Sequence, residues 1–249
     1  MSNYFINTNT RQITFTDNRF YTTDSGHHVP SVTTILQAYP KDAHFFKWLK
    51  EVGEDADTIR DEAGRRGSIV HKLTEEYDAG LEINLLNSDG NIGYKLAEWS
   101  MFERYVQFRK SHDFEVLLSE VNIVDPKLGY AGTIDRVIRY NGKNILLDIK
   151  TSNAIHDQYW LQLAAYAELY KKNIKGKNKQ IDDVAILWLN AKTRTEKQFQ
   201  GIGWQLVFRD KAERPNDMKL FKATQELWKA QNKTLQPKSL QYNITHKLC

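Results

Sequence analysis

Residues 132–150 read GTIDRVIRYNGKNILLDIK, and this stretch decides the fold around it. The pair Asn141-Gly142 predicts a two-residue hairpin turn, because both central positions of such a turn adopt positive φ angles. Runs rich in β-branched and apolar residues flank the turn, from 133 to 140 and from 143 to 149. The stretch therefore predicts two antiparallel strands joined by a tight turn.

The turn also fixes which residues of the two strands face each other. We expect Asp135 to lie opposite Asp148. Cross-strand partners share one side of a sheet, as do residues two apart along a strand. Thr133 and Lys150 should therefore join the two aspartates on one face. The residues expected mostly on the other face are Ile134, Ile138, Ile145, Leu147 and Ile149.

The facing carboxylates are the main functional clue in the sequence. Two acids directly opposite each other repel, so the fold gains nothing from placing Asp135 against Asp148. A divalent cation between them would remove that cost, and carboxylate oxygens suit Mg²⁺ or Mn²⁺. Lys150 can orient or deprotonate a water, or neutralise a phosphate. A metal beside a lysine is an arrangement for phosphodiester hydrolysis.

Composition narrows the class of protein. The chain has 249 residues, is 41% hydrophobic and 27% charged, and carries a formal net charge of +4. This balance fits one soluble domain with elaborations. No apolar run reaches the roughly 20 residues of a membrane span, and the N-terminus resembles neither a signal peptide nor a presequence. A lone Cys249 excludes an internal disulfide framework and a cysteine zinc site, so we expect a reducing cytosolic compartment.

The remaining pattern predicts an α/β fold with a mixed central sheet, helices on both sides and an N-terminal embellishment of short strands. The expected helices cover residues 32–39, 41–52, 61–80, 93–112, 155–172 and 215–231. The further expected strands cover residues 114–124, 184–189 and 204–208. A strand, helix, strand crossover from 143–149 to 184–189 implies that these two strands are parallel.

Two arginines stand out in the expected helix 61–80. Arg65 and Arg66 fall at or just before its expected start, where positive charge opposes the helix macrodipole. They therefore indicate a nearby anion, or else they are solvated or pair with Asp61 and Glu62. Both interpretations stay open at this point.

Three other features also have a plain and a functional interpretation. Glu120 interrupts the apolar strand 114–124, so it either faces outward or is held by a partner. The lysine-rich segment 171–179 is a solvated connection or a phosphate contact. His27 and His28 are expected to be solvated loop residues rather than ligands.

Several motifs together resemble the RecB-like branch of the PD-(D/E)xK nuclease superfamily, over about residues 30 to 190. They are Gly67-Ser68-Ile69-Val70-His71, Gly132-Thr133-Ile134-Asp135, Asp148-Ile149-Lys150-Thr151-Ser152 and Gln162-x-x-x-Tyr166. The run 30–36, PSVTTIL, is similar to phage-encoded exonucleases and to the mitochondrial genome maintenance exonuclease of that branch. The resemblance implies a restriction-endonuclease-like core. We expect a single domain over residues 1–249, with an N-terminal embellishment at 1–60, the nuclease core at 61–210 and a C-terminal helix and tail at 211–249.

The resemblance also implies roles for individual residues. The implied catalytic set is Asp135, Asp148, Lys150, Gln162 and Tyr166. The implied metal shell is His71, Glu120, Asp135, Asp148 and the backbone carbonyl of Ile149. The implied DNA contacts are Arg65, Arg66, Ser68, Lys72, Thr151, Ser152 and Gln158. Nothing in the core pattern is missing, so an active enzyme is expected.

The expected activity is a Mg²⁺- or Mn²⁺-dependent deoxyribonuclease. The resemblance favours an exonuclease that acts on DNA with single-stranded ends, in replication, recombination or repair, in the cytoplasm of a bacterial cell or phage-infected host. A structure-selective endonuclease, a duplex exonuclease and an inactive nucleic-acid binding module are the alternatives. The sequence predicts no iron–sulfur cluster, no nucleotide cofactor and no membrane partner. A helicase, single-strand-binding or recombination protein is a possible partner, supplied by another chain.

Overall fold

The computed structural model describes residues 4–7, 12–15, 18–176, 179–190 and 203–237. Its centre is a five-stranded sheet in the order β5-β6-β7-β8-β9. The strands are β5 (Glu115–Asp125), β6 (Tyr130–Tyr140), β7 (Lys143–Lys150), β8 (Asp183–Trp188) and β9 (Gln205–Phe208). Only β7 and β8 pair in parallel, as the crossover predicted, and the other neighbours are antiparallel.

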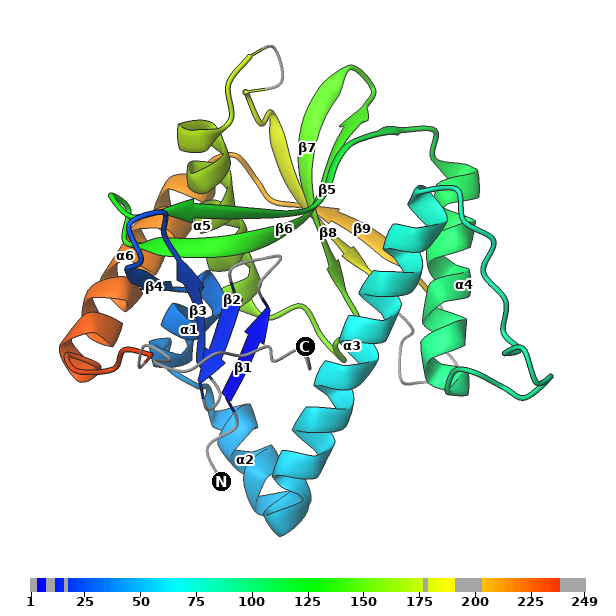
Figure 1. The fold of residues 1–249 in the computed structure, drawn as a ribbon, viewed down its shortest axis with the longest axis horizontal. Helices are drawn as coiled ribbons and strands as arrows, with labels where there is room; N and C mark the ends of the chain where they lie inside the picture. The colour runs from blue at the N-terminus through cyan, green and yellow to red at the C-terminus, as the bar shows by residue number, and fades with distance from the viewer. Residues whose placement is uncertain (1–3, 8–11, 16–17, 177–178, 191–202, 238–249) are drawn as a thin grey trace, which may run out of the picture.

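Helices cover both faces of this sheet, as Figure 1 shows. Residues of α5 (Asp157–Asn173) and α6 (Arg214–Gln231) form one apolar cluster with the sheet. Residues of α3 (Ala56–Asp78) and α4 (Leu96–Ser111) form a second cluster on its other face. The predicted mixed α/β architecture is therefore confirmed, and it is consistent with a restriction-endonuclease-like fold.

The central hairpin has the predicted turn and register. Asn141 and Gly142 have φ angles of 50° and 75°. The ladder between β6 and β7 runs from this turn to Arg136 opposite Leu147. It ends one pair before Asp135, so the two aspartates lie just beyond the last regular rung.

The predicted division of apolar residues between the two faces is correct except at one position. The residues that pack with α3 and α4 are Ile138, Ile145, Leu147 and Ile149. The prediction for Ile134 is wrong, because Ile134 is buried in the cluster of α5 and α6. Beyond the β6–β7 ladder, β6 continues only with β5, and this long pair bends away from β7 (Figure 1). The alternation expected from the hairpin does not extend through the bend.

A second, four-stranded antiparallel sheet forms from the N-terminal residues. Its strands are β1 (Tyr4–Asn7), β2 (Gln12–Phe15), β3 (Asn18–Thr22) and β4 (His28–Pro30). The pair Asp17-Asn18 between two polar runs predicts a hairpin turn here, and Asp17 lies outside the described residues. Ser31, a residue type that favours helix N-caps, caps α1 (Val32–Ile35) by accepting a hydrogen bond from the amide of Thr34 at 3.0 Å. The backbone of Ser31 also bridges Ala131, which attaches this unit to β6.

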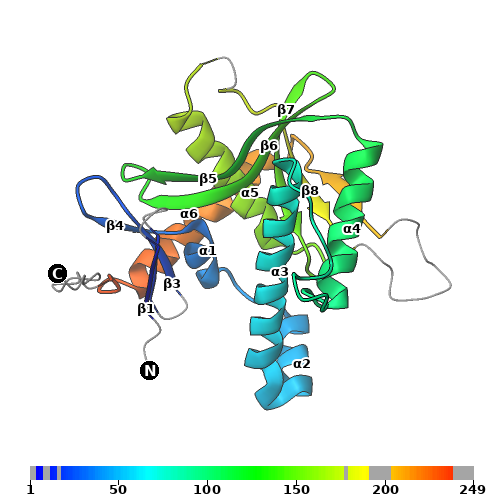
Figure 2. The same ribbon diagram turned by 45° about the vertical axis from the view of Figure 1, so that its right-hand side comes forward.

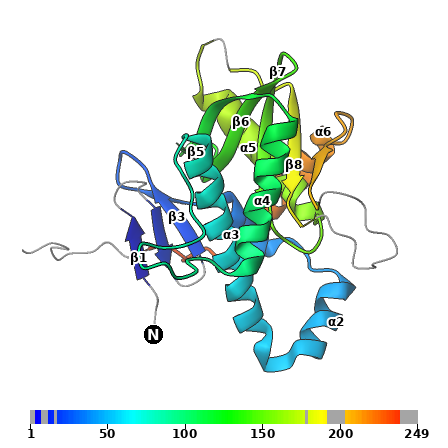
Figure 3. The same ribbon diagram turned by 90° about the vertical axis from the view of Figure 1, so that its right-hand side faces the viewer.

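A helical hairpin projects from the body of the protein (Figures 2 and 3). The chain passes from α1 through η1 (Leu36–Ala38) to α2 (Ala43–Val52), η2 (Gly53–Asp55) and α3. Asp42 caps α2, and no residue of α2 is buried. Among the described residues, no helix is long and apolar enough to cross a lipid bilayer.

The predicted start of α3 was wrong. The helix begins at Ala56, so Arg65 and Arg66 lie near its middle and the macrodipole argument does not apply to them. Gly64 and Gly67 disfavour a helix by about 1 kcal/mol each relative to alanine. The 23-residue helix nevertheless continues through both of them.

Candidate active site

Three ionisable side chains from three elements converge at the end of the central ladder. They are His71 of α3, Glu120 of β5 and Asp135 of β6. Each offers one ligand atom, and these atoms lie within 4.8 Å of one another. His71 Nδ1 is 3.5 Å from Asp135 Oδ2 and 3.7 Å from Glu120 Oε1. This is the spacing of a group that can hold one cation.

The imidazole of His71 is oriented by the backbone of β7. Its Nε2 lies 2.9 Å from the carbonyl oxygen of Ile149, which can only accept, so Nε2 carries a proton. Burial opposes the charged form of His71. The carboxylates of Asp135 and Glu120 outweigh it and raise the pKa of His71 to about 9. In the metal-free protein the imidazole is therefore the cation between these acids.

Glu120 reaches the cluster through an uncommon backbone conformation. Its φ angle is 47°, and the only other non-glycine residue with a positive φ in the described ranges is Asn141 of the turn. Its neighbours pair in register with β6, which places Glu120 opposite Asp135. Such a conformation costs about 1–3 kcal/mol. The carboxylate is half-buried and faces His71, so the outward-facing alternative for Glu120 is wrong.

Arg136 is a component of the site that the sequence analysis missed. Its side chain is fully buried and its Nε donates to Asp78 Oδ2 at 2.9 Å. Its Nη1 donates to the backbone carbonyl of Asp135 at 2.7 Å and lies 3.5 Å from Glu120 Oε1. The available signal was a guanidinium directly after Asp135 in an apolar strand. A charge buried there needs acidic partners.

Asp148 and Lys150 form an ion pair beside the cluster. Lys150 Nζ is 2.7 Å from Asp148 Oδ2, and Asp148 is 1% exposed. Burial raises the pKa of Asp148 to about 6, because the opposing charge of Lys150 does not outweigh burial and the charge of Asp135 adds to it. Burial lowers the pKa of Lys150, but Asp148 and Asp135 outweigh it and raise that pKa overall. Lys150 is therefore a cation in the metal-free protein.

A hydrogen bond from the backbone of β7 holds the side chain of Asp135. The amide of Ile149 donates to Asp135 Oδ2 at 2.8 Å, so the Asp135 side chain takes the place of the next rung of the ladder. Asp148 Oδ1 is buried and makes no hydrogen bond to a described residue. A buried carboxylate oxygen without a donor is costly unless a cation is beside it.

Helix α5 supplies the next layer of the site. Lys150 Nζ donates to Gln162 Oε1 at 3.1 Å, and Gln162 Nε2 donates to the hydroxyl of Tyr166 at 3.0 Å. Gln162 and Tyr166 are one helical turn apart, so both can face the sheet. Lys150 Nζ also lies 4.6 Å from the centre of the Tyr159 ring. The predicted catalytic lysine and helix motif are thus one hydrogen-bonded chain.

A small pocket of about 250 Å³ opens beside Lys150. Its wall combines residues of α1, η1 and α5 with a lysine that precedes α2. The lining residues are Thr33, Leu36, Gln37, Lys41, Lys150, Gln158, Tyr159 and Gln162. Thr33 lies in the run 30–36, but no sequence pattern assigns a role to Thr33, Gln37, Lys41 or Tyr159.

One comparison with known proteins identifies the family of this chain. A comparison with protein families matches residues 42–244 to the family described as the PD-(D/E)XK nuclease superfamily. This chain belongs to that superfamily.

Two solved structures are similar to this member of the PD-(D/E)XK superfamily. An alkaline exonuclease (LHK-Exo) from Laribacter hongkongensis matches at 12% identity and a TM-score of 0.33, with 82% of this chain and 89% of that chain covered. SSO0001 matches at 12% identity and a TM-score of 0.26, with 65% and 85% covered. A search of curated proteins finds no significant match.

The donor set of this PD-(D/E)XK protein fits a divalent metal. Members of the superfamily are typically metal-dependent phosphodiesterases, and Mg²⁺ or Mn²⁺ prefers carboxylate oxygens, with imidazole accepted by Mn²⁺. Carboxylates from three strands meet here, and Asp148 retains a buried oxygen with no donor. The site residues therefore suit such a cation, although Asp148 and the carbonyl of Ile149 are engaged by Lys150 and His71.

The residues expected to contact DNA do not all lie at the active site, and several have partners within the protein. Gln158 lines the pocket beside Lys150. Arg65 pairs with Glu98 at 2.6 Å rather than with Asp61 or Glu62. Other expected contacts also have partners within the protein: Lys72 lies 3.7 Å from Glu76, Ser68 donates to the Gly64 carbonyl and Ser152 donates to that of Ala154. Thr151 is buried, and Arg66 has a buried Nε without a hydrogen bond to a described residue.

Proposed function

We propose that this PD-(D/E)XK nuclease is a Mg²⁺- or Mn²⁺-dependent DNA exonuclease that acts on DNA with single-stranded ends. The observation that carries the proposal is the convergence of His71, Glu120 and Asp135 next to the Asp148–Lys150 pair. Acids, an imidazole and a protonated lysine at one point on a nuclease fold are suited to phosphodiester hydrolysis.

The acids and His71 would hold the metal in this proposal. When bound, a divalent cation polarises the phosphoryl oxygens and activates a water. Asp135 and Asp148 would be its principal ligands, and Glu120 with His71 would complete the shell. Arg136 keeps Glu120 and the backbone of Asp135 in place through its bonds to both.

Lys150 would act as a positive charge next to the reacting phosphate. Its pKa is raised by Asp148 and Asp135, which favours the protonated form over a general base. A buried cation at this point stabilises the negative charge that develops on the phosphoryl oxygens. Gln162 holds the ammonium by accepting its hydrogen bond, and Tyr166 in turn holds Gln162.

The pocket beside Lys150 and the surface of α2 support a substrate with unpaired bases. The pocket beside Lys150 has Tyr159, Lys41 and several amide groups in its wall, which suits one nucleotide rather than a duplex. On the projecting helix α2, Phe45 and Phe46 are 37% and 52% exposed. Exposed aromatic rings near lysines are a stacking platform for single strands.

The test is cleavage of an end-labelled linear single-stranded oligonucleotide beside its circular counterpart, with Mg²⁺, Mn²⁺ or EDTA. The wild type is compared with Asp148→Asn and Lys150→Ala, and Asp89→Asn on an exposed loop is the matched control. We expect metal-dependent loss of the linear substrate alone, abolished in the two site variants and unchanged in the control.

Other outcomes assign other functions. Cutting of the circle would show an endonuclease, and degradation of blunt duplex in preference to single strands would show a duplex exonuclease. Tight binding of the oligonucleotides without cleavage of any of them would show a nucleic-acid binding module.

A further inference from the structure

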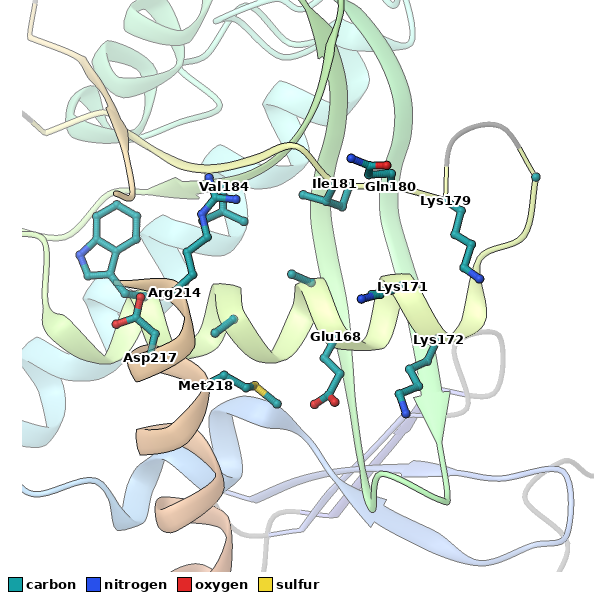
Figure 4. A pocket seen from close by; sticks show the side chains of 14 residues that line it. Glu168, Lys171, Lys172, Lys179, Gln180, Ile181, Val184, Arg214, Asp217 and Met218 are labelled. Carbon is teal, nitrogen blue, oxygen red and sulfur yellow. The ribbon is translucent and has the colours of Figure 1, made fainter. Parts of the chain in front are cut away.

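A second and larger pocket, of about 1030 Å³, lies between α5, α6 and the start of β8 (Figure 4). Its floor is largely apolar, formed by Trp160, Ala164, Ala167, Ile181, Val184 and Met218. Charged side chains stand around it, with Lys171 and Lys172 on the last turn of α5 and Lys179 on the segment that leads into β8. An apolar pocket of this size with a few polar groups at its edge is typical of a binding site.

This pocket is separate from the candidate active site. Successive residues of a helix are about 100° apart, which puts Ala164, Ala167 and Lys171 on the opposite side of α5 from Gln162. Gln162 faces Lys150, whereas Ala164 and Ala167 face the pocket. A ligand in this pocket therefore occupies the face of α5 that the catalytic arrangement does not use.

The acids in the pocket wall are already neutralised. Asp217 accepts two hydrogen bonds from Arg209, at 2.8 and 2.7 Å. Glu168 accepts from the hydroxyl of Tyr130 at 2.9 Å and lies 3.9 Å from Lys222. Arg214 is likewise paired, with its Nη2 2.6 Å from Asp183.

The lysines at the edge are not neutralised. Lys171, Lys172 and Lys179 are exposed, and none forms an ion pair with an acid in the described part of the chain. Lys171 and Lys172 also stabilise the C-terminal end of α5 through its dipole. That role does not apply to Lys179, which reaches the same pocket from a different segment. The pocket therefore combines an apolar floor with an excess of positive charge.

We infer that this pocket is a docking site for an acidic peptide segment of a partner protein, with a bulky apolar side chain next to its acidic residues. The apolar side chain would occupy the floor and the carboxylates would pair with the three lysines. A buried apolar anchor surrounded by complementary charges is how short peptides gain both affinity and orientation. The lysine-rich segment 171–179 would then bind a partner peptide rather than serve as a plain connection or a phosphate contact.

The chain's own remaining segments do not match this pocket. Segments 191–202 and 238–249 contain more basic than acidic residues, so they would repel the lysines. A separate acidic partner is the better complement.

The inference is tested by fluorescence anisotropy with the full chain in EDTA, which makes the result independent of nuclease activity. The probe is a fluorescein-labelled hexapeptide of four aspartates followed by leucine and phenylalanine. We expect saturable binding that weakens by about tenfold when the last two residues are replaced by glycines, and by a similar factor in Lys171→Glu/Lys172→Glu. Ala164→Trp, which fills the pocket without changing its charge, should also weaken binding.

The matched control is Lys50→Glu/Lys110→Glu, an equal charge change at exposed positions of α2 and α4, neither of which lines the pocket. Binding in this control should equal that of the wild type. No saturable binding to the wild type, or equal losses in the two double variants, would overturn the inference. A different outcome would be that a single-stranded oligonucleotide displaces the peptide and no longer binds to Ala164→Trp. That result would show that the pocket binds nucleic acid instead.

Discussion

Gly132 lies directly against the ring of Tyr166. A methyl group at Gly132 would be 3.1 Å from Cδ1 and 3.2 Å from Cζ of Tyr166, and closer still to Cε1. The hydroxyl of the same ring accepts the hydrogen bond from Gln162, which in turn accepts from Lys150. The glycine of β6 and the tyrosine of α5 are therefore one packing unit, and Gln162 connects it to Lys150.

Gly132→Ala should therefore lower both stability and activity. The methyl group forces Tyr166 away, and overpacking of this kind costs about 1–3 kcal/mol. Cleavage should fall by at least about tenfold, because Gln162 and Lys150 shift with the ring. Urea unfolding and single-turnover cleavage measure the two effects. The matched control is Gly64→Ala in α3, where nothing lies within 4 Å and the free energy of unfolding should rise by up to about 1 kcal/mol.

Because the backbone at Glu120 is strained, we expect substitutions of Glu120 to change protein stability and metal affinity in different ways. Glu120→Gln keeps the 47° φ angle and removes the charge, whereas Glu120→Gly also relieves the strain. Glu120→Gly should therefore be about 1 kcal/mol more stable than Glu120→Gln in EDTA. Both variants should bind Mn²⁺ several-fold more weakly than the wild type. Thermal unfolding measures the stabilities, and titration calorimetry measures the Mn²⁺ affinities. A glutamine variant more stable than the glycine variant, or full Mn²⁺ affinity in either variant, would contradict the prediction.

Particular residues show where sequence reasoning succeeds and where it stops. Asp135 and Asp148 could be brought together because a two-residue turn leaves one register. Glu120 could not be placed with them, because the loop between β5 and β6 is longer than two residues and does not by itself fix one register. Arg136 was missed because a guanidinium in a strand is normally exposed, and only the tertiary position of Asp78 makes its burial favourable.

Metal binding should stabilise the fold because it offsets repulsion among the buried acids. Adding Mn²⁺ to one hundred times its dissociation constant should raise the free energy of unfolding by about 2.7 kcal/mol. Asp135→Asn should lose most of this gain, since Asp135 lies in the His71 and Glu120 group. Asp89→Asn, on an exposed loop, should retain it. An equal response of the two variants to Mn²⁺ would place the metal elsewhere.

The charge of His71 predicts how stability depends on pH in EDTA. Asp135 and Glu120 raise the pKa of His71 to about 9 in the folded protein, against 6.5 when it is exposed. Folding therefore favours the protonated imidazole, and this contribution is fully present below pH 6.5 and lost as the pH rises through 9. The difference in unfolding free energy between the wild type and His71→Gln should accordingly be constant below about pH 6 and fall by on the order of 3 kcal/mol towards pH 10. Urea titrations at each pH measure this difference.

A flat difference across this range would show that His71 is not the cation between the acids. With saturating Mn²⁺ the trend should reverse, because an imidazole that binds metal has to lose its proton.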